Sequence, residues 1–477
     1  MAWASRSPDS WTRSGTDLHL DLDFTKQPRQ RLTEGIREAI RSGRLPVGSR
    51  LPSSRALAAD LNLARGTVVE AYAQLAAGGW IASRPRSGTV VISGGQVSPS
   101  PRAQPTSPVG LDLRPGDCDL ATFPPSFLTT AFRRALAHTP HSVFAYGDPR
   151  GAVDLRRELS DYLARTRGVR TDPEHLVITT GFTQSLHLTA QALAAIGSSR
   201  LAMEDPCLFL HRQVAATAGQ QAVSIRVDAD GIDIAALAEC GDDLRAVLVT
   251  PARQFPLGVS LRPGRRVGLI SWAQERSGFL IEDDYDGEFR YDRRPVGAIQ
   301  GLKPAHVLYA GTTSKTLAPG FRLGWLAVPD ELLDLVVEKK RLTDGQTSTL
   351  PQVVLADLLR TGAYDRHVRR MRRHYKHRRD ALLRELAAHA PHVQIDGIAA
   401  GLSISVTLPE GLEEREVIRQ ADARGLQVHG MTTHGYYAEG AGAHPGALVI
   451  NYAKPPEYAY SAAVAALVAI LARQPRR

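Results

Sequence analysis

Residues 310–325 have the sequence AGTTSKTLAPGFRLGW. One lysine, Lys315, lies in a turn rich in Ser, Thr and Gly between two apolar runs that are typical of strands, 306–310 and 322–328. A partly desolvated lysine amine at a strand end can lose its proton and attack an aldehyde. Arg322, seven residues later, suits an anion such as a phosphate. A solvated surface lysine is the alternative interpretation, and the remainder of the chain must decide between the two.

Length and composition indicate a globular protein with several domains. The 477 residues are enough for two or more domains, and 43% hydrophobic with 22% charged residues is ordinary for a soluble protein. The formal net charge of +9 mildly favours a polyanionic partner. Three cysteines, Cys118, Cys207 and Cys240, lie far apart without metal-ligand spacing, so we expect a reducing compartment and no metal site.

Targeting and membrane segments are not predicted. Residues 1–20 lack the apolar stretch of an export signal and are interpreted as a disordered leader. The longest late apolar run, 462–472, is too short to span a bilayer. We therefore expect a cytoplasmic protein that does not enter a membrane.

Residues 21–92 are predicted to form a winged helix-turn-helix domain, mainly α-helical. Leu32, Ile36 and Ile40 recur at helical spacing, a second helix begins near Ser53, and a third begins at Arg65 after a tight break. Two strand-like runs then flank a basic tip at 84–88. Arg65, Gly66 and Thr67 at the exposed start of the third helix suit a DNA major groove. The alternative is a small helical protein-interaction module with solvated arginines.

The residues that carry the first resemblance are 51–55 (LPSSR), 64–68 (ARGTV), Tyr72, Leu75 and Gly79-Trp80. In order and spacing they resemble the DNA-binding domain of GntR-type regulators, over about 28–92. The resemblance implies a double-stranded DNA operator as partner. The predicted DNA-contacting residues are Ser53, Arg55, Arg65, Gly66, Thr67, Arg86 and Gly88.

After a linker at 93–110 rich in Pro and Ser, residues 111–477 alternate short apolar strands with helices. Strands are expected at 176–180, 200–204, 222–227, 246–250 and 279–283, with helices such as 183–195 and 264–277 between them. This pattern predicts an α/β domain with a mostly parallel sheet, followed by a small α+β subdomain. The basic run 366–379 is interpreted as a solvated connecting helix, with a secondary DNA contact as the alternative.

Polar motifs follow several of these strands. Gly181 and Phe182 open a helix after one strand, where backbone N–H groups can hold a phosphate. Asp283, Asp284 and Tyr285 follow another, and there a carboxylate can keep a pyridine nitrogen protonated while a phenol bonds a ring hydroxyl. A metal site or a solvated turn are the other interpretations of the acidic cluster.

Together with 250–258, 146–151 and the Lys315 loop, these motifs resemble the fold-type I, aspartate-aminotransferase-like family that binds pyridoxal 5'-phosphate (PLP). With the GntR-like head, the chain resembles the MocR/GabR subfamily of PLP-dependent regulators. The resemblance implies a covalent aldimine of PLP with Lys315, and Asp283 on the pyridine nitrogen, with Asp284 as the other candidate. It further implies Tyr285 on the ring oxygen, and a phosphate site made by Arg322, Thr312, Gly181, Phe182 and Tyr146 of a partner subunit. It also implies a head-to-tail homodimer.

Three positions depart from the family pattern. Val449 stands where an arginine often clamps a substrate carboxylate, Leu208 where an aromatic ring often stacks on the cofactor, and Arg253 where regulators commonly have histidine. We therefore expect a PLP-dependent transcriptional regulator that senses PLP, an amine or an amino acid, with at most a residual aminotransferase half-reaction. The alternative is a PLP-dependent aminotransferase that carries a DNA-binding head.

Overall fold

The computed structural model describes residues 27–84, 88–92, 111–123, 125–292, 296–440, 442 and 444–472. The chain divides into two compact units, Met1–Pro108 and Val109–Arg477. The predicted leader 1–20, the linker 93–110 and Arg86 at the wing tip lie outside the described residues. Within the described ranges, no helix has the length and apolar character needed to cross a membrane.

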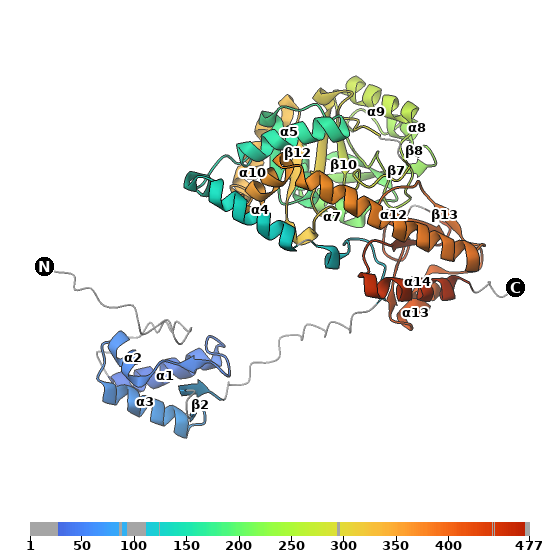
Figure 1. The fold of residues 1–477 in the computed structure, drawn as a ribbon. Coiled ribbons are helices and arrows are strands. Elements are labelled where there is room, and N and C mark those ends of the chain that lie inside the picture. Colours follow the sequence, from blue (N-terminus) through green and yellow to red (C-terminus); the bar gives the residue numbers. More distant parts are fainter. Residues whose placement is uncertain are drawn as a thin grey trace. The chain divides into compact units, whose positions relative to one another are not determined.

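The described residues of the first unit form three helices and a small antiparallel sheet (Figure 1). Leu32, Ile36 and Ile40 are buried on one side of the first helix, as their spacing predicts. The sheet has the order β1-β3-β2, and its first strand was missed because two residues show no periodicity. The elements are α1 (Pro28–Arg41), β1 (Arg50–Leu51), α2 (Ser54–Asp60), α3 (Arg65–Ala77), β2 (Ile81–Arg84) and β3 (Gly88–Val91).

The start of α2 is fixed by two hydrogen bonds. The Ser53 Oγ accepts from the backbone N–H of Ala56 at 3.1 Å, which is the bond of a helix N-cap. The buried Tyr72 hydroxyl on α3 donates to the Pro52 carbonyl at 2.9 Å. The Tyr72 bond ties the start of α2 to α3. With the β2–β3 hairpin that follows α3, the predicted winged helix-turn-helix arrangement is confirmed.

The second unit is built on an eight-stranded sheet with the order β5-β12-β11-β10-β9-β6-β7-β8. The pairs from β11 to β7 are parallel, whereas β12 runs antiparallel to both of its neighbours. The strands are β5 (Leu176–Thr179), β6 (Arg200–Asp205), β7 (Gln221–Asp228), β8 (Gly231–Ile232), β9 (Ala246–Val249), β10 (Phe279–Asp284), β11 (Val307–Thr312) and β12 (Gly324–Ala327).

Helices cover both faces of this sheet. Neighbouring residues of one strand enter different cores: Ile281 packs with α6 (Phe182–Ala195), α7 (Phe209–Thr217) and α10 (Asp330–Asp344), whereas Leu280 packs with α9 (Pro263–Glu275). Because side chains on both faces of the sheet are buried, successive residues of each strand are apolar, and the strands appear in the sequence as continuous apolar runs. The remaining helices of the large part are α4 (Pro125–His138), α5 (Val153–Arg167), α8 (Ile234–Ala238) and α11 (Thr349–Arg360).

The smaller C-terminal region packs around a second sheet with the order β13-β14-β17-β16. The predicted α/β domain with an α+β subdomain is therefore confirmed. The elements of the smaller region are β4 (Leu111–Asp112), β13 (Gln394–Asp396), β14 (Ser403–Thr407), α13 (Glu414–Asp422), β15 (Leu426–Gln427), β16 (His429–Gly430), β17 (Ala447–Asn451) and α14 (Glu457–Leu471).

The long basic helix α12 (Ala363–His389) runs from the large part of the second unit to this smaller region (Figure 1). Its interpretation as a helix solvated on nearly all sides is wrong. Met371 and Leu382 belong to the C-terminal core, and Arg378 is buried, with Nη2 2.9 Å from Asp119 and 2.8 Å from Glu457. The packed face escaped notice because buried tyrosines and a paired arginine interrupt the aliphatic pattern.

Candidate functional site

The Lys315 loop connects two antiparallel neighbours of the large sheet. Thr312 at the end of β11 pairs with Gly324 at the start of β12. The backbone N–H and the hydroxyl of Thr313 both donate to the Leu323 carbonyl at 3.0 Å, which closes the base of the loop. The loop is thereby held at the edge where the parallel strands end, which is where ligands collect in α/β sheets.

A cradle suited to a phosphate lies beside this loop. Gly181 has φ +118° and precedes the first turn of α6, so the free N–H groups of the helix start point away from the helix. A Cβ atom at Gly181 would lie 3.7 Å from Arg322 Nη1, so the guanidinium faces this helix start. Thr312 Oγ1 accepts from the Ser314 N–H at 3.1 Å and shares a 2.8 Å hydrogen bond with its hydroxyl. A helix N-terminus, a guanidinium and two hydroxyls form an anion site.

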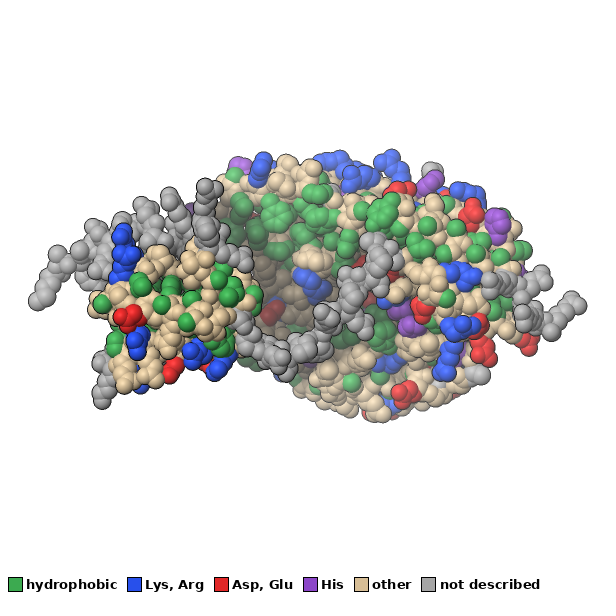
Figure 2. Space-filling model, turned by 90° about the horizontal axis from the view of Figure 1, so that it is seen from below, with side chains coloured by type: hydrophobic (Ala, Val, Ile, Leu, Met, Phe, Trp, Pro, Cys, Tyr) green, Lys and Arg blue, Asp and Glu red, His purple; other side chains and the backbone are tan. Residues whose placement is uncertain are grey.

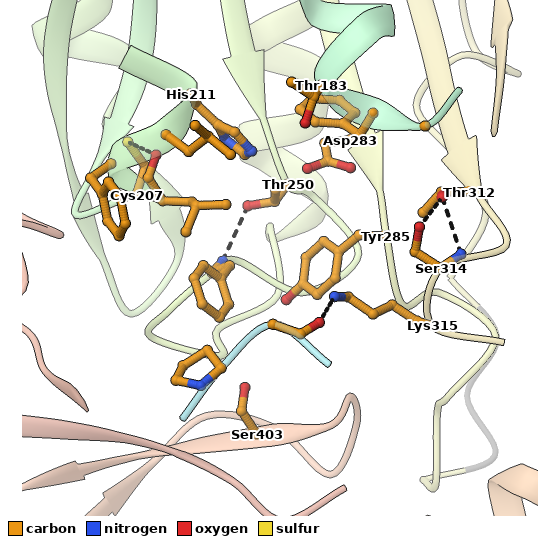
Figure 3. A pocket seen from close by; sticks show the side chains of 18 of the residues that line it. Thr183, Cys207, His211, Thr250, Asp283, Tyr285, Thr312, Ser314, Lys315 and Ser403 are labelled. Carbon is orange, nitrogen blue, oxygen red and sulfur yellow. Dashed lines mark hydrogen bonds between the residues drawn. The ribbon is translucent and has the colours of Figure 1, made fainter. Parts of the chain in front are cut away.

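Lys315 projects into the same cavity, where its Nζ donates to the Gly116 carbonyl (Figure 3). Burial lowers the pKa of Lys315, and the carboxylates of Asp117, Asp286 and Asp283 oppose this effect without cancelling it. A lysine with a lowered pKa has a larger fraction of neutral amine at a given pH, which is the form that attacks a carbonyl.

The two neighbouring aspartates of β10 point to opposite faces of the sheet. Asp284 is engaged away from the cavity: it accepts from Arg167 Nε at 2.6 Å and from the Tyr309 hydroxyl at 2.7 Å. Asp283 lines the cavity and is 5% exposed. Its Oδ1 has no hydrogen-bond partner among the described residues, and burial raises its pKa well above the ordinary value. A buried carboxylate without a partner fits a ligand that brings a cationic N–H, such as a pyridinium.

Tyr285 follows these aspartates and also lines the cavity. Its hydroxyl accepts from Arg253 Nη1 at 2.9 Å, and burial raises its pKa. Arg253 is itself buried, with Nη1 3.3 Å from Asp286 and Nη2 donating to the Ser403 carbonyl. The departure from histidine at this position therefore places a guanidinium directly on the tyrosine that was predicted to bond the cofactor oxygen.

The cavity that these residues share has a volume of about 290 Å³ and largely apolar walls. Leu208 and Phe209 both line it, and stacking of a cofactor ring on this segment stays a prediction. His211 also lines the cavity and was not predicted, although it lies three residues after Leu208 and helical spacing could have indicated it. Burial lowers the pKa of His211 to about 4, so its imidazole is neutral. Further lining residues not anticipated are Phe255, His429, Tyr436 and Asn451.

A buried carboxylate supports one wall. Glu204 is 4% exposed and accepts from the backbone N–H of Thr250 at 3.1 Å. Burial raises the pKa of Glu204 to about 7. Thr250 in turn accepts from the Phe255 N–H at 3.3 Å (Figure 3), so this carboxylate helps to fix the aromatic wall.

The structure brings together seven of the eight predicted cofactor residues: Lys315, Asp283, Tyr285, Arg322, Thr312, Gly181 and Phe182 all line one cavity. Tyr146 is not among them. Its side chain is fully exposed, at 102% of the reference area. A role for Tyr146 in the site of a second copy stays a prediction.

The predicted DNA-contacting residues of the first unit are largely at its surface. Arg65 and Gly66 are exposed at the start of α3, Arg55 is exposed on α2, and Thr67 is half-buried. A Cβ atom at Gly66 would meet nothing within 4 Å, so the backbone there is open to close approach. Gly88 has φ +76° and begins the return strand of the hairpin.

Comparison with known protein families agrees with both parts. Residues 28–91 match the family described as bacterial regulatory proteins, gntR family, and residues 109–420 match aminotransferase class I and II. The HTH-type pyridoxine biosynthesis transcriptional regulator PdxR of Corynebacterium glutamicum is 32% identical, over 88% of this chain and 91% of its own length. The chain belongs to this family of HTH-type transcriptional regulators. The resemblance to the MocR type is thereby confirmed.

Two more regulators of this type are similar over most of their length. The uncharacterized regulator YdeL of Bacillus subtilis is 34% identical over 84% of this chain and 88% of its own, and the probable rhizopine catabolism regulatory protein MocR of Rhizobium meliloti is 32% identical over 86% and 87%. Among solved structures, Pyrococcus horikoshii kynurenine aminotransferase superposes with a TM-score of 0.69 at 26% identity, covering 76% of this chain and 91% of that one. The GntR-type domain implies DNA binding, and the aminotransferase domain implies PLP as the cofactor.

Proposed function

We propose that this regulator binds an operator in double-stranded DNA as a homodimer, and that PLP, alone or together with an amine or amino acid, changes its affinity for that operator. The observation that carries the proposal is that one cavity holds both a lysine whose pKa is lowered and a buried aspartate whose Oδ1 has no hydrogen-bond partner among the described residues. Such a pair is costly in a protein that binds nothing there. Binding to DNA would place the protein in the cytoplasm.

The residues toward PLP have separate roles. Arg322, the hydroxyl of Thr312 and the N–H groups at Gly181 and Phe182 would hold the phosphate, because they already form an anion site. Asp283 would accept the hydrogen bond of the pyridinium, and Tyr285, held by Arg253, would orient the ring oxygen. When bound, PLP supplies an aldehyde that condenses with amines, and Lys315 would provide the first of them.

The homodimer rests on the exposed apolar surface of the second unit. Tyr146 and Leu136 are exposed by 102% and 52%, and hydrophobic side chains gather on one face of that unit (Figure 2). Burying such side chains against a second copy would be favourable. A head-to-tail arrangement would bring Tyr146 to the phosphate site of the partner and would couple cofactor binding to the spacing of the two DNA-binding heads.

Regulation then follows from linkage. A ligand changes DNA affinity only to the extent that it binds one arrangement of the dimer more tightly than the other. The test is the affinity of the purified protein for DNA from the region upstream of its own gene, measured with and without PLP. We expect a change of about 5- to 150-fold in the wild type, and no change in a Lys315→Ala variant; an equal change in both proteins would refute the proposal.

An aminotransferase with a DNA-binding head is the second candidate, because seven of the eight predicted cofactor residues line the cavity. Steady-state assay with an amino donor and a keto acid separates the two functions. The regulator is expected to show at most one half-reaction per bound cofactor, whereas sustained turnover would favour the enzyme.

A further inference from the structure

The positive charges of the cavity are few and already have roles. Among the described residues that line it, the lysine and arginine side chains are Lys315 and Arg322. Arg322 faces the helix start at Gly181, and Lys315 is the amine for the aldehyde. Two histidines, His211 and His429, also line the cavity, but burial lowers the pKa of each to about 4. At neutral pH they carry no charge that could pair with a carboxylate.

Three cations that contact residues of the lining are each held by another group as well. Arg253 pairs with Asp286, with Nη1 at 3.3 Å. Lys454 Nζ lies 3.0 Å from Asp112 and 3.5 Å from Asp117. Arg212 donates to the carbonyls of Gly435, Tyr436 and Tyr437. Recruiting any of them for a ligand would first break these contacts.

The wall on the side of the small sheet is apolar. Val449 lies on β17, opposite Ser405 on β14 and His429 on β16, and is fully buried. It belongs to a hydrophobic cluster with Met431 and Tyr436, against which Leu208 and Phe255 pack. Tyr436, Leu208 and Phe255 line the cavity themselves, so this cluster forms its wall.

The other ionisable side chains of the lining include the acidic groups Asp117, Glu204 and Asp283, none of which can supply a positive charge. A ligand carboxylate would therefore be desolvated beside an apolar wall and acidic groups with no counter-charge, which is unfavourable. A primary amine without a carboxylate is cationic in water but reacts in its neutral form, so it brings no negative charge into the cavity. Its apolar substituent would be buried against the apolar wall, which is favourable.

We propose that the ligand sensed in this cavity is a primary amine with an apolar substituent and no carboxylate. The inference rests on the proposed function, since it names the ligand class of the same site. In the exchange, the incoming amine forms a C=N bond to the aldehyde carbon of PLP while the C=N bond to Lys315 breaks. The two amine hydrogens pass to Lys315 Nζ, and nothing is oxidised or reduced.

The test uses matched pairs of ligands on the full-length, PLP-loaded protein. Phenethylamine is compared with L-phenylalanine, and isoamylamine with L-leucine, by the change in the visible absorbance of the cofactor. We expect half-maximal change at a concentration at least about tenfold lower for each amine than for its amino acid, because an unpaired buried charge opposes the latter. L-Phenylalanine methyl ester keeps a substituent of similar size in place of the carboxylate but has no negative charge. Its half-maximal concentration should therefore resemble that of phenethylamine.

A second experiment introduces a group that can pair with a ligand carboxylate. Val449→Arg places a guanidinium in the apolar wall. It should narrow the difference between L-phenylalanine and phenethylamine in the concentration that gives half-maximal absorbance change. Val449→Met, with a long neutral side chain, should leave this difference unchanged. Equal or tighter binding of the amino acids by the wild type would overturn the inference and leave the proposed function standing. Absence of any absorbance change with PLP, or the same band in Lys315→Ala, would overturn both. The wild-type series decides the matter even if Val449→Arg does not fold.

Discussion

Replacing Asp283 or Asp284 by asparagine should have opposite consequences, although the two residues are adjacent and equally buried. Asp284 holds Arg167 in a 2.6 Å ion pair, with both side chains nearly inaccessible to solvent. Asp284→Asn would leave a buried guanidinium without its counter-charge. We expect the free energy of unfolding of the second unit to fall by about 3–5 kcal/mol.

Asp283→Asn changes a carboxylate whose Oδ1 has no partner among the described residues. The cofactor-free protein should lose no stability and should gain up to about 1–3 kcal/mol, because a desolvated unpaired group is replaced by a neutral one. PLP should instead bind less tightly. A hydrogen bond to a charged group contributes about 1.5–3 kcal/mol, which corresponds to about 10- to 150-fold in affinity.

Two measurements on each variant separate these effects: thermal unfolding of the cofactor-free protein, and titration with PLP followed by absorbance. The reasoning would be refuted if Asp283→Asn bound PLP as tightly as the wild type. It would also be refuted if Asp283→Asn were destabilised as much as Asp284→Asn.

Three further predictions concern the DNA-binding head and the pH response. Arg55→Ala should lower the slope of log DNA affinity against log salt concentration, measured by fluorescence anisotropy, by about 0.9, as for one lost phosphate contact. Arg415→Ala, which removes an exposed arginine of α13, should leave this slope unchanged. Ser53→Ala removes the cap of α2 and should destabilise the head by about 0.5–2 kcal/mol in chemical denaturation. The raised pKa of Glu204, about 7, means that protonation stabilises the folded state, and this stabilisation is lost as the pH rises from about 4.5 through 7. Glu204→Gln should therefore flatten the fall in melting temperature between pH 5 and 8; an unchanged slope would contradict the assignment.

Much of the fold follows from periodicity in the sequence. The helical spacing in α1 and the apolar runs of β5, β6, β9 and β10 gave element types that the structure confirms, because buried strands and amphipathic helices leave strong local patterns. The antiparallel direction of β12 was not predictable, since strand direction depends on pairing and not on local pattern. The packed face of α12 was likewise hidden, because the burial of Arg378 depends on Asp119, which is distant in sequence.

The residues of the candidate site likewise fall into those that local sequence pattern predicted and those that it did not. Residues at strand ends and helix starts, such as Lys315, Asp283 and Gly181, could be selected because the sheet brings such positions together. The choice between Asp283 and Asp284 could not be made from spacing alone, whereas the opposite orientation of their side chains distinguishes them. His429 and Asn451 come from the small sheet, and their approach to Lys315 depends on the packing of two regions distant in sequence.

The most direct test of the central claim is the affinity for PLP, measured by absorbance titration in the presence and absence of saturating operator DNA. If PLP regulates DNA binding, reciprocity requires DNA to change the affinity for PLP by the same factor as PLP changes the affinity for DNA. We predict a shift of equal size, in the direction set by the DNA-binding measurement. Identical PLP affinities with and without DNA would contradict the account.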